Sequence, residues 1–188
     1  MLISTVSNAS IAEIKQQLGK EIAVVRAMPN IAVSVGESMT CLCSDEFVGP
    51  ETKEEAREIF ATLGRQTMFI TKEQMTPATA LCACGIAFFL RAIRAAAQGG
   101  VEVGFHAEGA IRLAAQTARG AATLILDGNT HPEALLDQVT TPMGVTIAGL
   151  NEMEHHGFSS AMIRGIVTSA EKATRLYREQ ENKNGEDH

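Results

Sequence analysis

The chain has 188 residues and a formal net charge of −6, and 45% of its residues are apolar although only 4% are aromatic. A core with few aromatic side chains must rest on Ala, Leu, Ile, Val and Met, which favours helix-on-helix packing. Lys and Arg are scattered and form no basic stripe, so a nucleic-acid partner is not expected. No uninterrupted apolar run reaches the roughly 18 residues of a membrane helix. Residues 1–10 lack a signal-peptide pattern, and the four cysteines are therefore expected to be reduced thiols of a cytoplasmic protein.

The first third of the chain alternates between helix and strand patterns. A helix is expected from Ile11 to Leu18, because Ser10 and Glu13 form a capping-box pattern and Gly19 can end the helix. The other elements expected here are a strand over 22–26, a turn over 28–30, a strand over 38–43, a helix from Pro50 to Leu63 and a strand over 67–71. This order indicates an α/β segment.

From Lys72 onward the pattern is helical almost throughout. We expect helices over residues 85–98, 107–126, a short stretch ending at 139, 144–155 and 158–179, followed by a polar tail. The predicted organisation is an α/β segment over residues 1–71, an all-α domain over 72–180 and a tail over 181–188.

Two of these helices, over 85–98 and 107–126, are rich in alanine and apolar on nearly all sides. A helix that is apolar on all sides must be buried on all sides. One domain of this size rarely hides two such helices alone. The pattern favours an interleaved homodimer, and a large monomeric core is the alternative.

Three segments have a composition suited to binding. Residues 26–30 follow a strand, where open α/β sheets place ligands, although Pro-Asn is also ordinary turn chemistry. Residues 79–85 join two helices through small side chains, either as an anion site at a helix start or as a tight junction. Residues 137–146 either hold a carboxylate or form a plain cap, with Thr141 as N-cap and Pro142 as the first helical residue.

The cysteines form two C-x-C pairs, Cys41–Cys43 and Cys82–Cys84. Alternate residues of a strand share a face, so the first pair could point the same way and a Cys₄ zinc site is conceivable. Structural zinc sites prefer a wider spacing, and free cysteines are often simply buried. No metal is expected. His106 and His131 are expected to be cap or turn residues, and His155–His156 to be solvated.

Five motifs in this order resemble pyrroline-5-carboxylate reductase. Residues 26–30 match R-x-M-P-N, residues 79–87 occupy the place of T-A-L-S-G-S-G-P-A, and residues 131–139 match H-P-x-x-L-x-D-x-V. Residues 141–150 correspond to S-P-G-G-T-T-I-A-G-L, and residues 153–158 fit L-E-x-x-G-F. The likeness runs from about Ile11 to about Arg178.

The resemblance implies a fold and a reaction. The fold would be mainly α, with a small α/β remnant of a Rossmann-type domain followed by an all-α helical dimerisation domain. The reaction would reduce the C=N bond of 1-pyrroline-5-carboxylate to L-proline with NADPH or NADH, the last step of proline synthesis. The cofactor would supply the chemistry while the protein orients both partners.

The resemblance also assigns candidate site residues, in sites that the family shares between subunits. The substrate carboxylate would be held by Gly144, Val145 and Thr146. Thr146 is also a candidate proton donor to the imine nitrogen, with a bound water as the alternative. The cofactor would be contacted by Thr5, Val6, Ser7 and Asn30, and by Gln138 of the other subunit.

The chain departs from the family pattern in four ways, and two of them, the missing glycine-rich motif and Met143, favour an alternative, a catalytically inactive dimerising relative. The chain has no G-x-G-x-x-G motif, which in the family precedes the position matching Met1, so its cofactor site is expected to be incomplete. Met143 replaces a glycine and would be strained if that position needs a positive φ. Residues 82–84 with Ile86 replace S-G-S and the following Pro, and Ile31-Ala32 replaces T-P. We expect this chain alone not to bind NADPH tightly.

Overall fold

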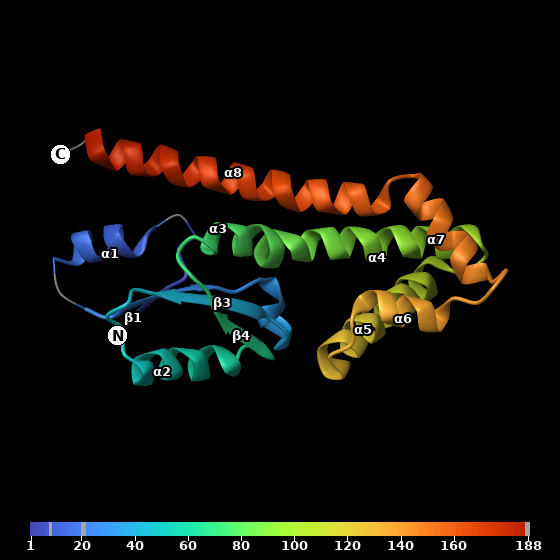
Figure 1. Ribbon diagram of the computed structural model, residues 1–188, viewed down its shortest axis with the longest axis horizontal. Helices are drawn as coiled ribbons and strands as arrows, with labels where there is room; N and C mark the ends of the chain where they lie inside the picture. Colours follow the sequence, from blue (N-terminus) through green and yellow to red (C-terminus); the bar gives the residue numbers. More distant parts are fainter. Residues whose placement is uncertain (8, 20–21, 187–188) are drawn as a thin grey trace. The chain divides into compact units, whose positions relative to one another are not determined.

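The computed structural model describes residues 1–7, 9–19 and 22–186, and Figure 1 shows its elements. The chain divides into two compact units, which are described separately below. The sheet unit contains residues 1–86 and the chain from Gly165 onward, and the helical unit contains Ala87–Arg164. The two units separate after Ile86, within a helix. The domain boundary expected at residue 71 stays a prediction.

The sheet unit is built on a mixed four-stranded sheet with the order β1-β2-β3-β4. Its strands are β1 (Leu2–Ser4), β2 (Val24–Met28), β3 (Met39–Ser44) and β4 (Gln66–Phe69). β1 pairs parallel with β2, β2 antiparallel with β3, and β3 parallel with β4. The sequence predicted β2, β3 and β4 with starts and ends within two residues of those observed. It did not predict the three-residue β1.

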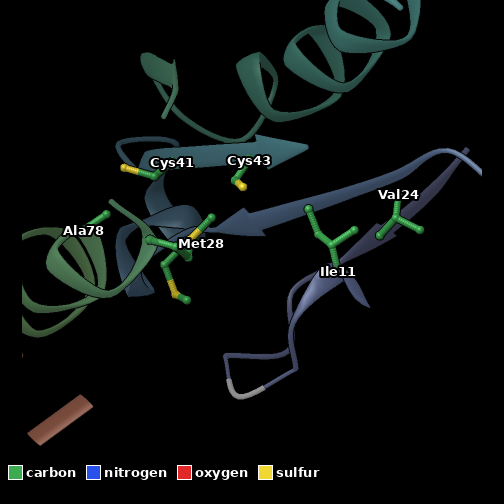
Figure 2. Packing of buried hydrophobic residues seen from close by; sticks show 7 residues of the cluster. Ile11, Val24, Met28, Cys41, Cys43 and Ala78 are labelled. Carbon is green, nitrogen blue, oxygen red and sulfur yellow. The ribbon is translucent and has the colours of Figure 1, made fainter. Parts of the chain in front are cut away.

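Helices cover both faces of this sheet (Figure 1). α1 (Ile11–Leu18) and α3 (Met75–Ala78) pack through Ile11, Met75 and Ala78 against one face, which includes Val24, Met28, Cys41 and Cys43. Figure 2 shows several of these side chains. α2 (Pro50–Ala61) packs through Ala56 and Phe60 against Val25, Ala27 and Leu42 on the other face. Alternate residues of β2 and β3 therefore supply two cores, and each fully buried Val or Leu stabilises the fold by about 1.5–3 kcal/mol.

The capping box expected at α1 is confirmed. The Ser10 hydroxyl accepts a hydrogen bond from the Glu13 amide at 3.1 Å, and the Glu13 carboxylate accepts one from the Ser10 amide at 2.7 Å. Gly19 ends the helix with a φ of 57°, in the left-handed region that glycine adopts without steric penalty. The observed helix has the bounds predicted from the sequence.

Gly64 allows the turn after α2 to pass against the start of β3. A Cβ at this position would lie 2.1 Å from the carbonyl oxygen of Ser38, which is backbone and cannot move aside. Ser38 is itself buried, and its hydroxyl accepts a hydrogen bond from the Asn30 amide at 3.1 Å. Only glycine fits at residue 64.

The helices of the second half begin close to their predicted starts. They are α4 (Gly85–Glu102), α5 (Ala107–Gly128), α6 (Pro132–Val139), α7 (Val145–His155) and α8 (Phe158–Glu186). The polar tail expected over residues 181–188 overlaps the end of α8, which extends to Glu186. Between α4 and α5 of the helical unit, Gly100 approaches Ala110 closely, so that an added Cβ would lie 3.2 Å from the Ala110 Cβ.

The expected break between a short helix and α4 is absent. α3 continues through η2 (Thr79–Cys84), a π-helical segment, into α4, and the helical run extends from Met75 to Glu102. By length and composition alone this run could cross a membrane, although it contains no uninterrupted apolar stretch of 18 residues. Arg91 and Arg94 interrupt the apolar sequence of this run, but the run as a whole is still apolar enough to cross a membrane.

Candidate functional site

The turn before α7 holds the residues that the resemblance assigns to the substrate. The Gly144 amide donates a hydrogen bond to the Thr141 carbonyl at 2.9 Å, which closes a four-residue turn with Pro142 and Met143 at its centre. Met143 has a φ of 59°. Proline followed by a residue of positive φ is the pattern of a type II turn, which prefers glycine at the second central position. The conditional expectation of backbone strain at Met143 is therefore confirmed.

Gly144 is needed in this turn for space, since its own φ is −75°. A Cβ at residue 144 would lie 2.4 Å from the Thr141 hydroxyl oxygen and 2.9 Å from the Thr141 carbonyl oxygen. Gly144 is the N-cap of α7, and no side chain caps the helix. The plain-cap alternative, with Thr141 as N-cap and Pro142 as first residue, is wrong.

The start of α7 leaves backbone donors exposed. The first amides of a helix have no acceptor within the helix, and here these belong to Val145 and Thr146. Both residues are exposed, and Val145 has a relative accessibility of 91%. Gln138 lies near the end of α6, six positions before Gly144, and is also exposed. The segment therefore presents unpaired helix-start amides and one hydroxyl, groups of a kind that can donate hydrogen bonds to an anion.

In the sheet unit, the loop after β1 is held by Arg26. The guanidinium of this buried residue donates hydrogen bonds to the carbonyl oxygens of Ser7 at 3.0 Å and Val6 at 3.4 Å. β1 and β2 are parallel neighbours, so this loop and the segment at Asn30 follow the same edge of the sheet. Arg26 was not predicted as a site residue, although a charged residue in the apolar run 22–26 was a usable signal.

Asn30 connects three elements of the sheet unit. Its side-chain oxygen accepts from the Ala32 amide at 2.9 Å and so caps the 3-10 helix η1 (Ile31–Val35), which the sequence did not predict. Its side-chain nitrogen donates to the Cys82 carbonyl at 3.3 Å. Its backbone amide donates to the Ser38 hydroxyl. The Asn30 side chain therefore fixes the position of η2 relative to the loop after β2.

The segment over 79–85 is not a helix start. Residues 79–84 lie in a π-helix, where the backbone is already hydrogen bonded, so free amides for an anion are not available there. The anion-site interpretation of this segment is wrong. π-helical segments are nevertheless common at functional sites.

The four cysteines are free thiols. As expected, Cys41 and Cys43 lie on the same face of β3, within one core cluster (Figure 2). The described residues contain no group of three or more metal-ligating side chains, which gives the zinc interpretation no support. Burial raises the pKa of the Cys43 thiol. The Cys41 sulfur lies 3.8 Å from the sulfur of Cys82 in η2.

Four of the histidines lie at helix ends. His131 is the N-cap of α6 and its Nδ1 accepts from the Glu133 amide at 3.3 Å. His106 occupies the N-cap position of α5. His155 and His156 are exposed at the end of α7, as expected.

The helical unit exposes a large apolar surface. A hollow of about 700 Å³ within this unit is lined almost wholly by apolar side chains of α4, α5, α7 and α8 and of the connection between α4 and α5. They include Phe89, Ile93, Phe105, Leu113, Met153 and Phe158. More than half of the Phe89, Leu90, Phe105 and Leu113 surfaces remain accessible. Apolar patches of this kind indicate an interaction surface.

Solved structures with the same fold are pyrroline-carboxylate reductases. The chain superposes on the Plasmodium falciparum enzyme, crystallised with NADP bound, with a TM-score of 0.85 and 27% identity, over 94% of this chain and 67% of that one. The Coxiella burnetii enzyme gives a TM-score of 0.88 at 27% identity, over 93% of this chain and 64% of that one. The expected fold class, a small Rossmann-type α/β segment followed by a helical dimerisation part, is confirmed.

Sequence comparison identifies the family. Residues 72–176 match the family described as "Pyrroline-5-carboxylate reductase dimerisation". Two Dictyostelium discoideum relatives are pyrroline-5-carboxylate reductase 1, with 58% identity over 97% of this chain, and pyrroline-5-carboxylate reductase 2, with 47% identity over 93%. The chain spans 35% of the first relative and 63% of the second. This chain belongs to the pyrroline-5-carboxylate reductase family and contains its dimerisation domain.

Proposed function

We propose that this chain forms the dimerising and substrate-binding part of a reductase that converts 1-pyrroline-5-carboxylate to L-proline with NADPH or NADH. The observation that carries the proposal is the uncapped start of α7 at Gly144–Thr146, within the segment that matches the family. A cytoplasmic setting is part of the proposal, and the four free thiols are compatible with it.

The start of α7 suits the carboxylate of the substrate. Backbone amides of Val145 and Thr146 and the positive end of the helix dipole favour an anion, and the Thr146 hydroxyl can add a charge-assisted hydrogen bond. Gly144 keeps this position accessible because a larger residue would collide with Thr141. Thr146 is also our candidate for passing a proton to the imine nitrogen.

The residues present suit the nicotinamide end of a cofactor better than its pyrophosphate. Thr5, Val6, Ser7 and Asn30 follow adjacent parallel strands, the usual ligand position in α/β sheets. When bound there, the reduced nicotinamide would supply the hydride. Arg26 would keep the loop after β1 in place, and Gln138 would reach the cofactor of the second subunit. The glycine-rich pyrophosphate motif is not found in this sequence.

Homodimer formation is supported by the apolar hollow of the helical unit and by the family match over the same helices. Burying Phe89, Phe105 and Leu113 against a second copy would remove a large apolar area from water, at about 25 cal/mol per Å². The same contact would cover the residues of α4 that line the hollow, from Phe89 to Gly100, without a membrane.

The reaction is tested by joining the segment of the Dictyostelium reductase 2 that precedes the matched region to this chain. We expect the chimera to oxidise NADPH when 1-pyrroline-5-carboxylate is added and to form L-proline. Thr146→Val should raise the KM for the substrate at least tenfold, whereas Thr62→Val, an exposed threonine of the sheet unit, should leave it unchanged. A folded, dimeric chimera without turnover would refute the reductase proposal.

The second candidate, an inactive dimerising relative, is favoured by Met143. Its side chain is fully exposed in the turn that precedes the substrate position, and the backbone there is in a conformation suited to glycine. Under this alternative the chimera stays inactive even with Met143→Gly. Calorimetry of this chain alone should give no micromolar NADPH binding under either candidate.

A further inference from the structure

Two cysteines that lie far apart in the sequence meet in the core of the sheet unit. Cys41 lies on β3 and Cys82 in η2, and their sulfur atoms are 3.8 Å apart. Cys41 is buried, with a relative accessibility of 3%, whereas Cys82 is partly accessible. Both are free thiols, so the pair is in the state from which a disulfide can form.

We propose that Cys41 and Cys82 form a redox-modification site, at which a hydroperoxide converts the two thiols into a reversible disulfide within one chain. The inference does not depend on the proposed reductase activity. In reducing compartments such disulfides are usually transient and sense oxidants.

The two cysteines have different roles because their environments differ. The hydrogen bond from Cys41 lowers the pKa of the Cys82 thiol to about 7, although burial opposes this shift. The same hydrogen bond raises the pKa of Cys41, and burial raises it further. Cys82 is therefore the thiolate that a small oxidant can reach, and Cys41 is the resolving thiol behind it.

The reaction balances in two steps. The Cys82 thiolate attacks one peroxide oxygen, the O–O bond breaks, and the departing hydroxide takes a proton to become water, leaving a sulfenic acid. The Cys41 sulfur then attacks the Cys82 sulfur, the S–O bond breaks, and the leaving hydroxide takes the Cys41 proton as a second water. Two thiols lose two electrons and two protons, and one hydrogen peroxide becomes two waters.

The local structure allows the required movement. A disulfide has an S–S distance of about 2.05 Å, so the sulfurs must approach by roughly 1.8 Å from their 3.8 Å separation. The proposal requires rotation about χ1 together with a small shift of the π-helical segment, which departs from regular α-helical pairing. The Asn30 side chain donates to the Cys82 carbonyl, so oxidation would also alter the support of the loop after β2.

The test treats the reduced 188-residue chain with stoichiometric hydrogen peroxide, blocks the remaining thiols with iodoacetamide and digests the product with trypsin. Trypsin leaves Cys41 with Cys43 in residues 27–53, and Cys82 with Cys84 in residues 73–91. We expect these two peptides to be linked and to separate with dithiothreitol. Fragment ions from within each peptide should assign the link to Cys41 and Cys82.

Matched variants keep the result decisive. The double variant C43S/C84S, which retains only the proposed pair, should lose both thiols to peroxide and gain the linked peptide. C43S/C82S and C41S/C84S each retain one thiol of each C-x-C pair and should form less than a tenth of that product. A link that persists in either of these variants, or a wild-type chain oxidised only to sulfinic acid or to a Cys82–Cys84 bridge, would overturn the proposal.

Discussion

The two units of this chain handle their apolar residues in opposite ways. In the sheet unit, β2 is wholly buried and β3 largely so, between α1 and α3 on one face and α2 on the other. In the helical unit, phenylalanine and leucine side chains of α4 and α5 are exposed around an apolar hollow. The sheet unit completes its core within one chain, whereas the helical unit has the surface of half an interface.

Gly64→Ala is expected to have the largest effect and to act on the sheet unit alone. The added Cβ meets the Ser38 backbone, so the turn must move, which should reduce the free energy of unfolding by about 3 kcal/mol. Urea unfolding followed by circular dichroism measures this. The control is Gly49→Ala, whose Cβ meets nothing within 4 Å; an equal loss in both variants would contradict the steric explanation.

Leu113→Asp is expected to break the interface while leaving the sheet unit folded. Leu113 lines the hollow of the helical unit, and burying an unpaired carboxylate there should weaken self-association by at least about 2 kcal/mol. Sedimentation equilibrium measures the dissociation constant. Phe47→Asp alters a more exposed apolar side chain of the sheet unit and should leave association unchanged. Dimers of unaltered affinity in Leu113→Asp would locate the interface elsewhere.

The pH dependence of Cys82 sharpens the account of the sheet unit. Because Cys41 lowers the pKa of Cys82 to about 7, the thiolate fraction and the rate of alkylation by iodoacetamide should fall as the pH drops through that value. In Cys41→Ala the midpoint should rise toward the ordinary thiol pKa of about 8.5. The rate is read from peptides carrying the label at Cys82 in a C84S background. An unchanged midpoint would show that the Cys41 hydrogen bond is not the cause.

Met143→Gly should have the smallest effect and should stabilise the helical unit. A left-handed backbone costs a residue with a side chain roughly 1–2 kcal/mol, part of which is offset by the greater freedom of glycine when unfolded, so a net gain of about 0.5–1 kcal/mol is expected. Asn129→Gly is the matched control, because asparagine tolerates its φ of 49° and should gain less. Thermal unfolding compares the two, and destabilisation by Met143→Gly would contradict the assigned strain.

Local signals in the sequence predicted much of the fold. The capping box and Gly19 gave both ends of α1, and Pro50, Pro132 and the apolar periodicity gave the starts of later helices. β1 was missed because its three residues are stabilised by pairing with β2 rather than by a pattern of their own. The sequence predicted a junction between two helices where the π-helix lies, because small residues are typical of both a junction and a π-helix.

The candidate site was predictable mainly through the family motif. The sequence pattern left a plain cap at Thr141 open, and only the three-dimensional turn shows that α7 begins after Gly144. The bracing of the loop after β1 by Arg26 and the contact between Cys41 and Cys82 join residues 19 and 41 positions apart. Contacts over such separations arise from tertiary packing, which no local pattern encodes.

Light scattering of the wild-type chain at micromolar concentration measures whether the helical unit binds a second copy of the chain. If the helical unit is half of an interface, the molar mass should be about twice the 20.0 kDa of one chain, or a higher even multiple. A stable 20.0 kDa monomer that remains soluble with its apolar surface exposed would contradict the account.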